Sequence, residues 1–483
     1  MNAHVSSTDA FQSANRVSPS MDAILARQRA AFLRDGPPSL AARKADLAKL
    51  KKAIRNYLPE FQKTLHDDFK GRSANDTAIL EGMAIVQGIN YLRRNLRGWM
   101  RPQKRRVEMH FAPASARVTY QPLGVVGIMS PWNLPVGLSL MPLATAIAAG
   151  NRAMIKPSEL TPATSNLLVR MLAEIFPAEQ VAVVTGGPEV GAAFSSLPFD
   201  HIVFTGSTPV GKAVMKAASA NLVPVTLELG GKSPVVIEGG FAPDRAAASL
   251  AFGKLANGGQ LCVSPDYVLV QENDVEAFVA AYDKAVKARY PEGPASEDYT
   301  SVINERHFAR LNALLDDARS NGARVIEVGA KPEGARRRPH TLAPTVVLGA
   351  TVEMDVLNEE IFGPVLPVVA YRKIEDAIAH INAGPRPLAL YYFGANGADR
   401  AKVLERTTSG NVTINDTILH FAQDDLPFGG VGASGIGAYH GIEGFRSLSH
   451  AKGIFEQSRW NMTGALRPPF GTLTRLVTWY LTR

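Results

Sequence analysis

The 483-residue chain contains a single cysteine, Cys262. One thiol cannot form an internal disulfide, and none of the ten histidines stands at a spacing typical of metal ligands, so we expect neither a disulfide framework nor a metal site. An isolated cysteine is more often a packing residue than a reactive one. Here Gly258, Gly259 and Gln260 precede the thiol. Glycines allow the backbone to approach a ligand closely, and this setting favours a nucleophile.

Other absences narrow the class of protein. Residues 1–20 lack the apolar run of a signal peptide, which favours a flexible N-terminal arm and a cytoplasmic protein. Residues 118–151 lack charge and are long enough to span a bilayer. Four prolines and an asparagine interrupt that stretch, so a strand, a turn and a buried helix are the better interpretation. The net charge is +8, but no aromatic residues alternate with the arginine clusters, which disfavours a nucleic-acid partner.

The hydrophobic pattern indicates an α/β fold. Periodic apolar positions over residues 21–98 predict helices, and alternation over residues 107–121 predicts extended chain. Beyond these, short apolar segments alternate with helical ones, which predicts parallel sheets covered by helices. The predicted strands are 124–129, 153–156, 181–184, 201–205, 223–228, 234–237, 267–270, 365–370, 388–393 and 411–415.

Two glycine clusters come close to a dinucleotide-binding fingerprint without matching it. The cluster at 186–191 contains Pro188 and is interpreted as a connecting turn. The cluster at 206–211 follows an apolar strand and opens a helix, where Ser207 and Thr208 can cap the first turn and its amides can receive a phosphate. Spacing alone would then make Glu228 a ribose ligand.

Seven motifs occur in one order over roughly residues 25–455: Pro131-Trp132-Asn133-Leu134-Pro135, Lys156-Pro157-Ser158-Glu159, Phe204-Thr205-Gly206-Ser207, Glu228-Leu229-Gly230-Gly231-Lys232, Gly259-Gln260-Leu261-Cys262, Glu359-Glu360-Ile361-Phe362-Gly363-Pro364 and Pro427-Phe428-Gly429-Gly430. In this combination the chain resembles the aldehyde dehydrogenase superfamily. Residues 262–267 resemble its class 3 branch. Residues 439–441 and the tail that follows Arg467 are most similar to bacterial coniferyl aldehyde dehydrogenases.

The resemblance implies a catalytic set from three distant motifs. Cys262 is the nucleophile, the Asn133 side chain and the Cys262 backbone amide stabilise the oxyanion, and Glu228 is the base that activates water to hydrolyse the thioester. Apolar neighbours are expected to desolvate Glu228 and raise its pKa. Each residue taken alone has a plainer interpretation: a packing cysteine, a turn asparagine between prolines, and a surface carboxylate at a strand end.

The resemblance also implies NAD as the cofactor, with NADP left open. A carboxylate at Glu159 favours a free ribose 2′-hydroxyl over a 2′-phosphate, which is the reason for preferring NAD. The implied cofactor-binding residues are the ribose ligands Lys156, Glu159 and Glu360, the nicotinamide neighbour Phe362, and Gly206 and Ser207 near the pyrophosphate.

The implied architecture has a Rossmann-like parallel-sheet NAD(P)-binding domain over residues 21–102 and 122–229 and an α/β catalytic domain over residues 230–420. A small β bridging element of residues 103–121 and 421–465 is expected to form a homodimer. Residues 466–483 are a C-terminal tail, which we expect to dock on the partner subunit, with membrane contact as the less favoured alternative. The substrate is a small-molecule aldehyde.

Two other functions remain open at this point. One is a non-catalytic scaffold of the same fold, and the other is a coenzyme-A-acylating aldehyde dehydrogenase, in which a thiol replaces water as the acyl acceptor. The retained thiol, carboxamide and carboxylate argue against the scaffold. Glu228 argues against the acylating enzyme, which needs no hydrolytic base.

Overall fold

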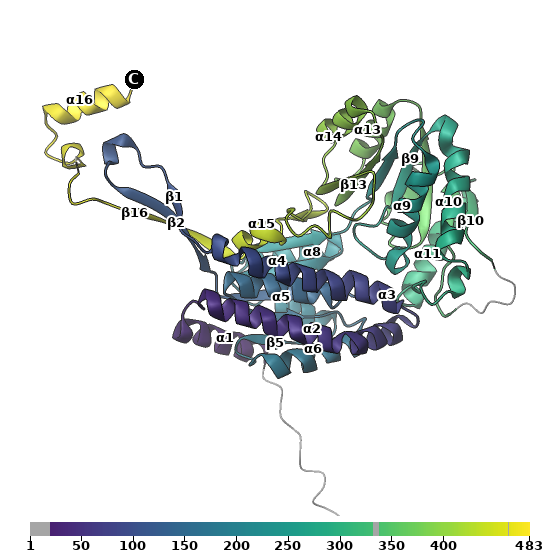
Figure 1. The fold of residues 1–483 in the computed structure, drawn as a ribbon, viewed down its shortest axis with the longest axis horizontal. Coiled ribbons are helices and arrows are strands. Elements are labelled where there is room, and N and C mark those ends of the chain that lie inside the picture. Colours follow the sequence, from purple (N-terminus) through teal and green to yellow (C-terminus); the bar gives the residue numbers. More distant parts are fainter. Residues whose placement is uncertain (1–19, 332–337, 462) are drawn as a thin grey trace, which may run out of the picture.

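The computed structural model describes residues 20–331, 338–461 and 463–483 (Figure 1). All but Ser20 of the expected N-terminal arm therefore lies outside the described residues. Three β-sheets organise the described part, with six, seven and three strands. The mixed α/β architecture with parallel sheets confirms the fold class expected from the sequence.

The helical pattern over residues 21–98 is confirmed as five elements: α1 (Met21–Asp35), α2 (Leu40–Phe69), α3 (Ala74–Asp76), the π-helix η1 (Thr77–Met83) and α4 (Ala84–Trp99). Ser20 and Ser39 are the N-cap residues of α1 and α2, because each side chain accepts a hydrogen bond from a first-turn amide. The pattern did not predict the break after Phe69 or the π-helical turn.

The six-stranded sheet has the order β15-β7-β6-β3-β4-β5. Its strands are β3 (Val125–Met129), β4 (Arg152–Lys156), β5 (Val181–Val183), β6 (His201–Gly206), β7 (Val225–Leu229) and β15 (Gly435–Ile436). All pair in parallel except β15. The chain therefore builds outward from β3 first on one side and then on the other. In such sheets ligands bind outside the carboxyl ends of the strands at this reversal, here between β3 and β6.

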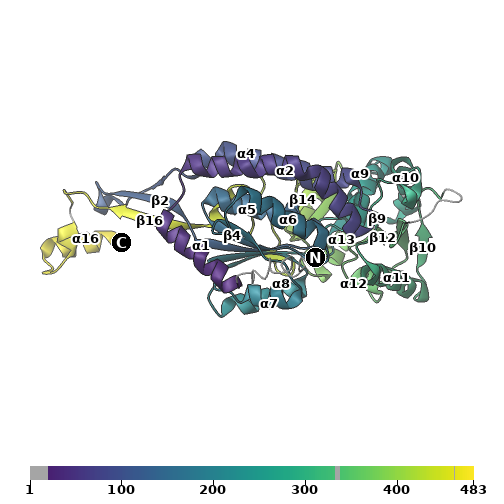
Figure 2. The same ribbon diagram turned by 90° about the horizontal axis from the view of Figure 1, so that it is seen from below.

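Helices cover both faces of this sheet (Figure 2). On one face lie α5 (Gly137–Ala149) and α6 (Pro162–Ile175), with α2 and α4 packed outside them. On the other face lie α1, α7 (Pro188–Ser195) and α8 (Thr208–Ser219). The uncharged stretch 118–151 thus contains the end of strand β2 (Ser115–Pro122), strand β3, a turn and the buried helix α5, in agreement with the predicted strand, turn and buried helix.

The seven-stranded sheet has the order β10-β11-β12-β9-β8-β13-β14 and is parallel except for the pair of β10 and β11. Its strands are β8 (Pro234–Ile237), β9 (Tyr267–Gln271), β10 (Arg324–Glu327), β11 (Thr345–Leu348), β12 (Val365–Tyr371), β13 (Ala389–Phe393) and β14 (Asn411–Ile414). Alternate residues face opposite cores, as the pleat requires. Val235 and Ile237 pack beneath α9 and α10, whereas Val236 packs beneath α13 and α14.

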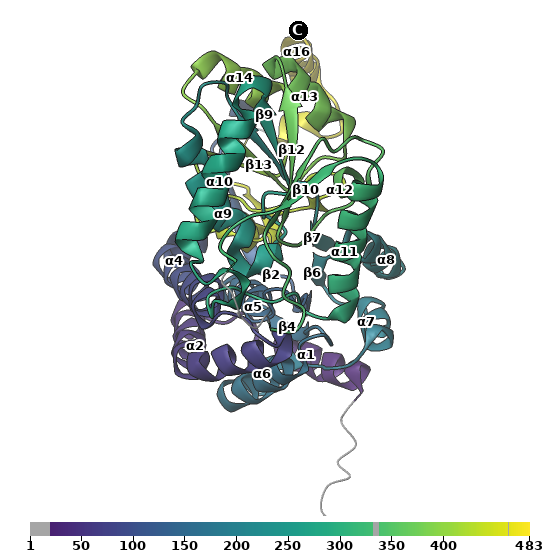
Figure 3. The same cartoon turned by 90° about the vertical axis from the view of Figure 1, so that its right-hand side faces the viewer.

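The helices of this half form the two outer layers seen in Figure 3. One layer consists of α9 (Pro243–Leu255) and α10 (Val275–Arg289). The other consists of α11 (Glu305–Ser320), α12 (Asp355–Asn358), α13 (Ile374–Ala383) and α14 (Gly397–Arg406). Among the described helices none combines the length and apolarity needed to cross a bilayer.

The three-stranded antiparallel sheet forms an arm that projects from the body (Figure 1). It contains β1 (Gln103–Arg105), β2 (Ser115–Pro122) and β16 (Ser449–Glu456), and helix α16 (Thr472–Leu481) lies beyond it. The predicted extended chain over residues 107–121 was wrong at its start, since Met109–Phe111 form a 3₁₀ turn.

The parts of the expected bridging segment 421–465 lie in different sheets. Only β16 from this segment joins the arm. Strand β15 instead pairs with β7, where the Leu229 amide donates to the Ser434 carbonyl at 3.0 Å, and α15 (Gly441–Ser447) packs against α5. The reason is the free edge of β7, whose backbone groups need partners that this returning chain supplies.

Candidate active site

Cys262 lies in the turn between α9 and β9, after a 3₁₀ turn over Ala256–Gly259. Asn257, Gly258 and Gly259 all have positive φ. A Cβ atom at Gly259 would lie 2.4 Å from the Gly363 carbonyl oxygen, and one at Gly258 would lie 2.7 Å from the Thr300 carbonyl oxygen. The glycines therefore allow close approach to neighbouring protein backbone. From the sequence alone, these glycines were expected to allow the backbone to approach a ligand.

The partly exposed Cys262 lies between two cavities and lines both. The first, of about 180 Å³, is bounded mainly by apolar side chains, among them Leu80, Met83, Leu138, Met141, Phe252, Ile418, Leu419 and Phe421. The second, of about 240 Å³, opens at the carboxyl ends of β3, β6 and β7 and is lined by Pro131, Trp132, Asn133, Leu138, Thr205, Gly206, Ser207, Glu228, Leu229, Gly230, Cys262, His307, Arg310, Glu360 and Phe362. The thiol thus faces an apolar cavity on one side and, on the other, a cavity that also presents charged and polar side chains.

Seven of the nine residues predicted from the sequence line the second cavity: Asn133, Gly206, Ser207, Glu228, Cys262, Glu360 and Phe362. Lys156 and Glu159 do not. Lys156 ends β4, the neighbour of β3, and Glu159 follows it, with Lys156 Nζ 2.8 Å from Glu159 Oε2. A dinucleotide is longer than one cavity, so a ligand that runs along the carboxyl edge of the sheet would reach both groups.

Glu228 is 3% exposed near the end of β7. Neither of its carboxylate oxygens has a hydrogen-bond partner among the described residues. Burial raises the pKa of this carboxyl well above its usual value, the direction that its apolar neighbours predict. A buried carboxyl with unused oxygens and a raised pKa is suited to taking a proton from water.

The electrostatics keep the thiol protonated at rest. Burial, followed by the nearby carboxyls of Glu360 and Glu228, raises the pKa of Cys262 to about 12. A nucleophilic role therefore needs a base within reach or a positive charge brought by a ligand. The carboxyl of Glu360 raises the pKa of Cys262 more than the carboxyl of Glu228 does, although the family resemblance implies that Glu360 binds the cofactor.

Asn133 follows β3 and is 3% exposed. Its side-chain Nδ2 donates to the Gln260 carbonyl at 2.9 Å, two residues before the thiol. A carboxamide nitrogen carries two hydrogens, so a second donor remains for an oxygen in the cavity. This geometry suits a carboxamide that stabilises negative charge beside Cys262.

Close packing brings Glu360 into the cavity. A Cβ atom at Gly230 would lie 2.0 Å from Glu360 Oε2, so the glycine leaves the space that this carboxylate fills. Burial, followed by the charge of Asp266, raises the pKa of Glu360 to about 8. Arg310 donates to the backbone carbonyls of Glu360 and Ile361. These bonds hold the segment that presents Phe362, whose φ is 51° and whose ring lies 5.4 Å from that of Trp132.

The start of α8 differs from the sequence expectation in one detail. Ser207 is the N-cap residue, but no hydrogen bond from a described side chain caps this helix. The Thr208 hydroxyl donates instead to the Ala433 carbonyl at 3.0 Å. An uncapped first turn leaves backbone amides for an anion, which fits the pyrophosphate of a dinucleotide at Gly206 and Ser207.

Sequence reasoning missed three residues near the thiol. His307 and Arg310 line the second cavity from α11, and no motif marks them. The buried Tyr439 hydroxyl has no hydrogen-bond partner among the described residues. Burial, followed by the charges of Glu228 and Cys262, raises the pKa of Tyr439. In the sequence, Tyr439-His440-Gly441 is a family signature, with His440 open to either a structural role or contact with substrate, and His440 lines the apolar cavity.

Comparison with known proteins gives consistent matches. The sequence model described as "Aldehyde dehydrogenase family" matches residues 4–454. A probable coniferyl aldehyde dehydrogenase of Pseudomonas aeruginosa is 51% identical over 455 residues, covering 93% of this chain and 94% of the relative. The coniferyl aldehyde dehydrogenase of Pseudomonas sp. HR199 is 46% identical, covering 92% and 93%. Aldehyde dehydrogenase family 3 member H1 of Arabidopsis thaliana is 35% identical, covering 89% and 88%.

Solved structures also match this chain over most of its length. The substrate-bound state of Staphylococcus aureus AldH superposes with a TM-score of 0.90 at 35% identity, covering 96% of this chain and all of that one. A Mycobacterium tuberculosis aldehyde dehydrogenase complexed with NAD+ superposes with a TM-score of 0.80 at 30% identity, covering 90% and 89%.

Proposed function

Because the chain belongs to the aldehyde dehydrogenase family, we propose that it oxidises an aromatic aldehyde of the coniferyl type. Aldehyde oxidation to the carboxylic acid with NAD(P)+ and the class 3-like relationship are confirmed by the family matches. The scaffold and acylating alternatives are set aside. The substrate proposal is supported by the relatives named for coniferyl aldehyde and by the apolar cavity that ends at Cys262.

The position of Cys262 between two cavities is the observation that carries the mechanism. A base removes the thiol proton, and the sulfur adds to the carbonyl carbon of an aldehyde held in the apolar cavity. The C=O electron pair moves to oxygen, where the Asn133 carboxamide and the Cys262 backbone amide stabilise it. The residues that line the second cavity would hold NAD(P)+, which would supply the acceptor for the hydride that leaves the former aldehyde carbon.

The acyl group then remains on Cys262 as a thioester. We assign Glu228 as the base that takes a proton from water while the water oxygen adds to the acyl carbon. The C–S bond breaks, the carboxylic acid leaves, and the thiol is regenerated. One aldehyde, one NAD(P)+ and one water thus give one acid, one NAD(P)H and one proton.

The residues that would hold the dinucleotide follow the carboxyl edge of the six-stranded sheet. Gly206, Ser207 and the first amides of α8 suit the pyrophosphate. Glu360 suits the nicotinamide ribose and Phe362 the nicotinamide ring, since both line the cavity that holds the thiol. Lys156 and Glu159 suit the adenine ribose, further along at β4.

Changing Glu159 to Gln is expected to move cofactor preference toward NADP+. Removing the carboxylate relieves its repulsion of a 2′-phosphate, and about 1.4 kcal/mol of relief gives about tenfold. The measurement is the ratio of kcat/KM for the two cofactors. Glu405, exposed on α14, gives the control variant Glu405→Gln. An unchanged ratio in the Glu159→Gln variant would remove this residue from the cofactor site.

The same proposal covers domains and assembly. The six-stranded sheet carries the cofactor domain, the seven-stranded sheet the catalytic domain, and the projecting arm joins two copies as a homodimer. A three-stranded sheet needs a packed apolar face for stability, and β16 is one of its two edge strands. Helix α16 exposes Leu476 and Tyr480 beyond the arm, which supports docking on the partner subunit in preference to a membrane.

The proposed location is the cytoplasm, where a lone thiol stays reduced.

A substrate panel tests the proposed substrate. We expect kcat/KM for coniferyl aldehyde to exceed that for a medium-chain fatty aldehyde by about tenfold, a difference of about 1.4 kcal/mol in transition-state binding. The readout is NAD(P)H formation with coniferyl aldehyde, benzaldehyde and hexanal. A higher value for hexanal would replace the aromatic substrate with an aliphatic one.

Two leucine variants provide the matched control for that panel. Leu419 is half-exposed and lines the apolar cavity, whereas Leu404 is exposed on α14, away from that lining. Leu419→Glu should raise the KM for the preferred aldehyde, because a charge at the cavity disfavours an apolar ligand. Leu404→Glu should leave the KM unchanged.

A further inference from the structure

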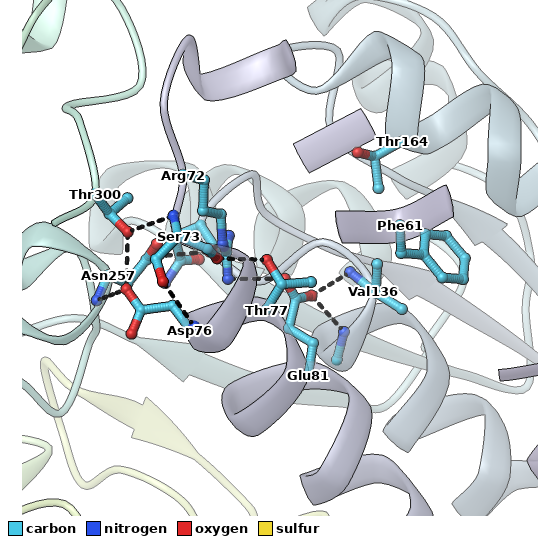
Figure 4. Close-up of polar contacts among 12 residues, drawn as sticks. Phe61, Arg72, Ser73, Asp76, Thr77, Glu81, Val136, Thr164, Asn257 and Thr300 are labelled. Carbon is cyan, nitrogen blue, oxygen red and sulfur yellow. Dashed lines mark hydrogen bonds and ion pairs between the residues drawn. The ribbon is translucent and has the colours of Figure 1, made fainter. Parts of the chain in front are cut away.

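A buried ion pair lies behind the segment that carries Asn133. Arg72 follows α2, Glu81 lies in η1, and Arg72 Nη2 is 2.8 Å from Glu81 Oε1 (Figure 4). The two side chains are 0% and 1% exposed. Burying two charges costs more than their attraction returns unless they make further good hydrogen bonds. The partners of this pair therefore indicate what it holds in place.

Those partners are the two ends of one short segment. Arg72 Nη1 donates to the Asn133 carbonyl oxygen at 2.7 Å. Glu81 Oε2 accepts from the Val136 amide at 2.7 Å and the Gly137 amide at 2.9 Å, where α5 begins (Figure 4). The ion pair thus fixes the backbone at both ends of residues 133–137.

The cysteine turn is attached to the same cluster. Asp76 Oδ2 accepts from the Asn257 amide at 3.0 Å and from the Thr300 hydroxyl at 2.7 Å (Figure 4). Asn257 Nδ2 in turn donates to the Asn133 carbonyl oxygen at 3.0 Å. Residues 72–81 therefore set the spacing between the Asn133 segment and the turn that presents Cys262.

The opposite side of η1 faces the substrate. Ile79, Leu80 and Met83 line the apolar cavity, while Glu81 is directed to Arg72 and to the start of α5. π-helical turns are frequent at functional sites. Here that geometry allows one turn to supply both a cavity wall and a backbone anchor.

We propose that Arg72 and Glu81 are positioning residues, which hold the Asn133 backbone so that its carboxamide meets the oxyanion formed at Cys262. The inference rests on the oxyanion role proposed above for Asn133. Arg72 bonds the Asn133 carbonyl directly, and we expect most of its effect on the reaction to pass through that residue. A misplacement of about 1 Å far from the chemistry can cost about a hundredfold in rate.

The test is a double-mutant cycle between Arg72 and Asn133. The readout is the single-turnover rate of NADH formation with coniferyl aldehyde, or with the best aldehyde of the panel. Asn133→Ala should lose about a hundredfold to a thousandfold, as for other oxyanion donors. Arg72→Met should lose about tenfold to a hundredfold with KM nearly unchanged. Adding Arg72→Met to Asn133→Ala should cost less than about twofold further, because the residue it positions is gone.

A second variant guards against loss of folding. Arg72→Met leaves the Glu81 carboxylate buried without its cation, whereas Arg72→Met with Glu81→Gln removes both charges, a change that buried pairs often tolerate. This charge-free variant replaces the single one in the cycle if the latter does not fold, and Arg72→Lys, which keeps the cation opposite Glu81, serves if neither folds. Melting temperatures report the folding of each.

The measured rates distinguish a failure of the positioning role of Arg72 from a failure of the oxyanion role of Asn133. If Arg72→Met slows both backgrounds by the same factor, the pair is merely structural and the positioning role is overturned. Wild-type rates in the folded Arg72 variants would overturn it as well. If Asn133→Ala keeps the wild-type rate, the oxyanion assignment itself fails, and with it any need for positioning.

Discussion

Replacing Cys262 with Ala is expected to abolish aldehyde oxidation while leaving NAD(P)+ binding intact. Loss of a catalytic nucleophile can lower turnover by about 10⁶-fold. The residues that suit the dinucleotide lie on β4, α8 and the segment at 360–362, so removing the sulfur does not touch them. The measurements are NAD(P)H formation for activity and calorimetry for the cofactor dissociation constant. Activity above about one-hundredth of wild type would contradict the nucleophile assignment, given that factor.

The raised pKa of the thiol provides an independent check on the same residue. A free cysteine ionises near pH 8.5, so its alkylation rate levels off above that value. Cys262, with a pKa of about 12 in the cofactor-free protein, should react with iodoacetamide at a rate that still rises well above pH 9. Because the chain has one cysteine, the labelled mass reports this site alone. A plateau near pH 8.5 would mean that the thiol is less buried than it is here.

Replacing Glu228 with Gln should trap the acyl-enzyme. Loss of a general base costs about a hundredfold to ten-thousandfold, and here the cost falls on hydrolysis of the thioester. One equivalent of NAD(P)H should form in a burst, followed by slow turnover, and intact mass should show one acyl group on the protein. Since burial raises the pKa of Glu228, the base form increases as pH rises, and wild-type deacylation should accelerate with pH. The Gln variant should lose that dependence.

Glu360→Gln is the matched control for this experiment. Both carboxyls line the same cavity, both have raised pKa values, and Glu360 affects the thiol more strongly. As a ribose ligand, Glu360 should change the KM for the cofactor without accumulating acyl-enzyme. If acyl-enzyme accumulates in the Glu360 variant while the Glu228 variant deacylates normally, Glu360 is the hydrolytic base and Glu228 is not.

The sequence predicted most of the buried strands but missed β11, whose four residues are all buried. Parallel strands covered on both faces appear as short apolar runs, and β3, β6, β9 and β12 all do. The pattern failed for β10, an antiparallel edge strand that begins with Arg324 and ends with Glu327, so its apolar run is only two residues long. It also failed for β15, whose two residues, Gly435 and Ile436, form a strand only because β7 offers an edge.

The candidate site was predictable where its residues stand in motifs. Asn133, Glu228 and Cys262 lie in segments with a recognisable local pattern, and the structure brings them to one cavity. Arg72 and Glu81 lie in no motif, and in sequence they read as surface charges on a helical stretch. Their burial depends on hydrogen bonds to residues more than fifty positions away, which no local pattern encodes.

The position of the Cys262 sulfur between two cavities affects how substrate and cofactor enter and leave the enzyme. In the proposed mechanism the aldehyde reaches the sulfur from the apolar cavity and the dinucleotide from the second cavity, so neither blocks the other's path. A spent cofactor can depart while the acyl group is still attached. The space that the reduced cofactor leaves adjoins Glu228. The water that hydrolyses the thioester can therefore enter along the path by which the reduced cofactor departs.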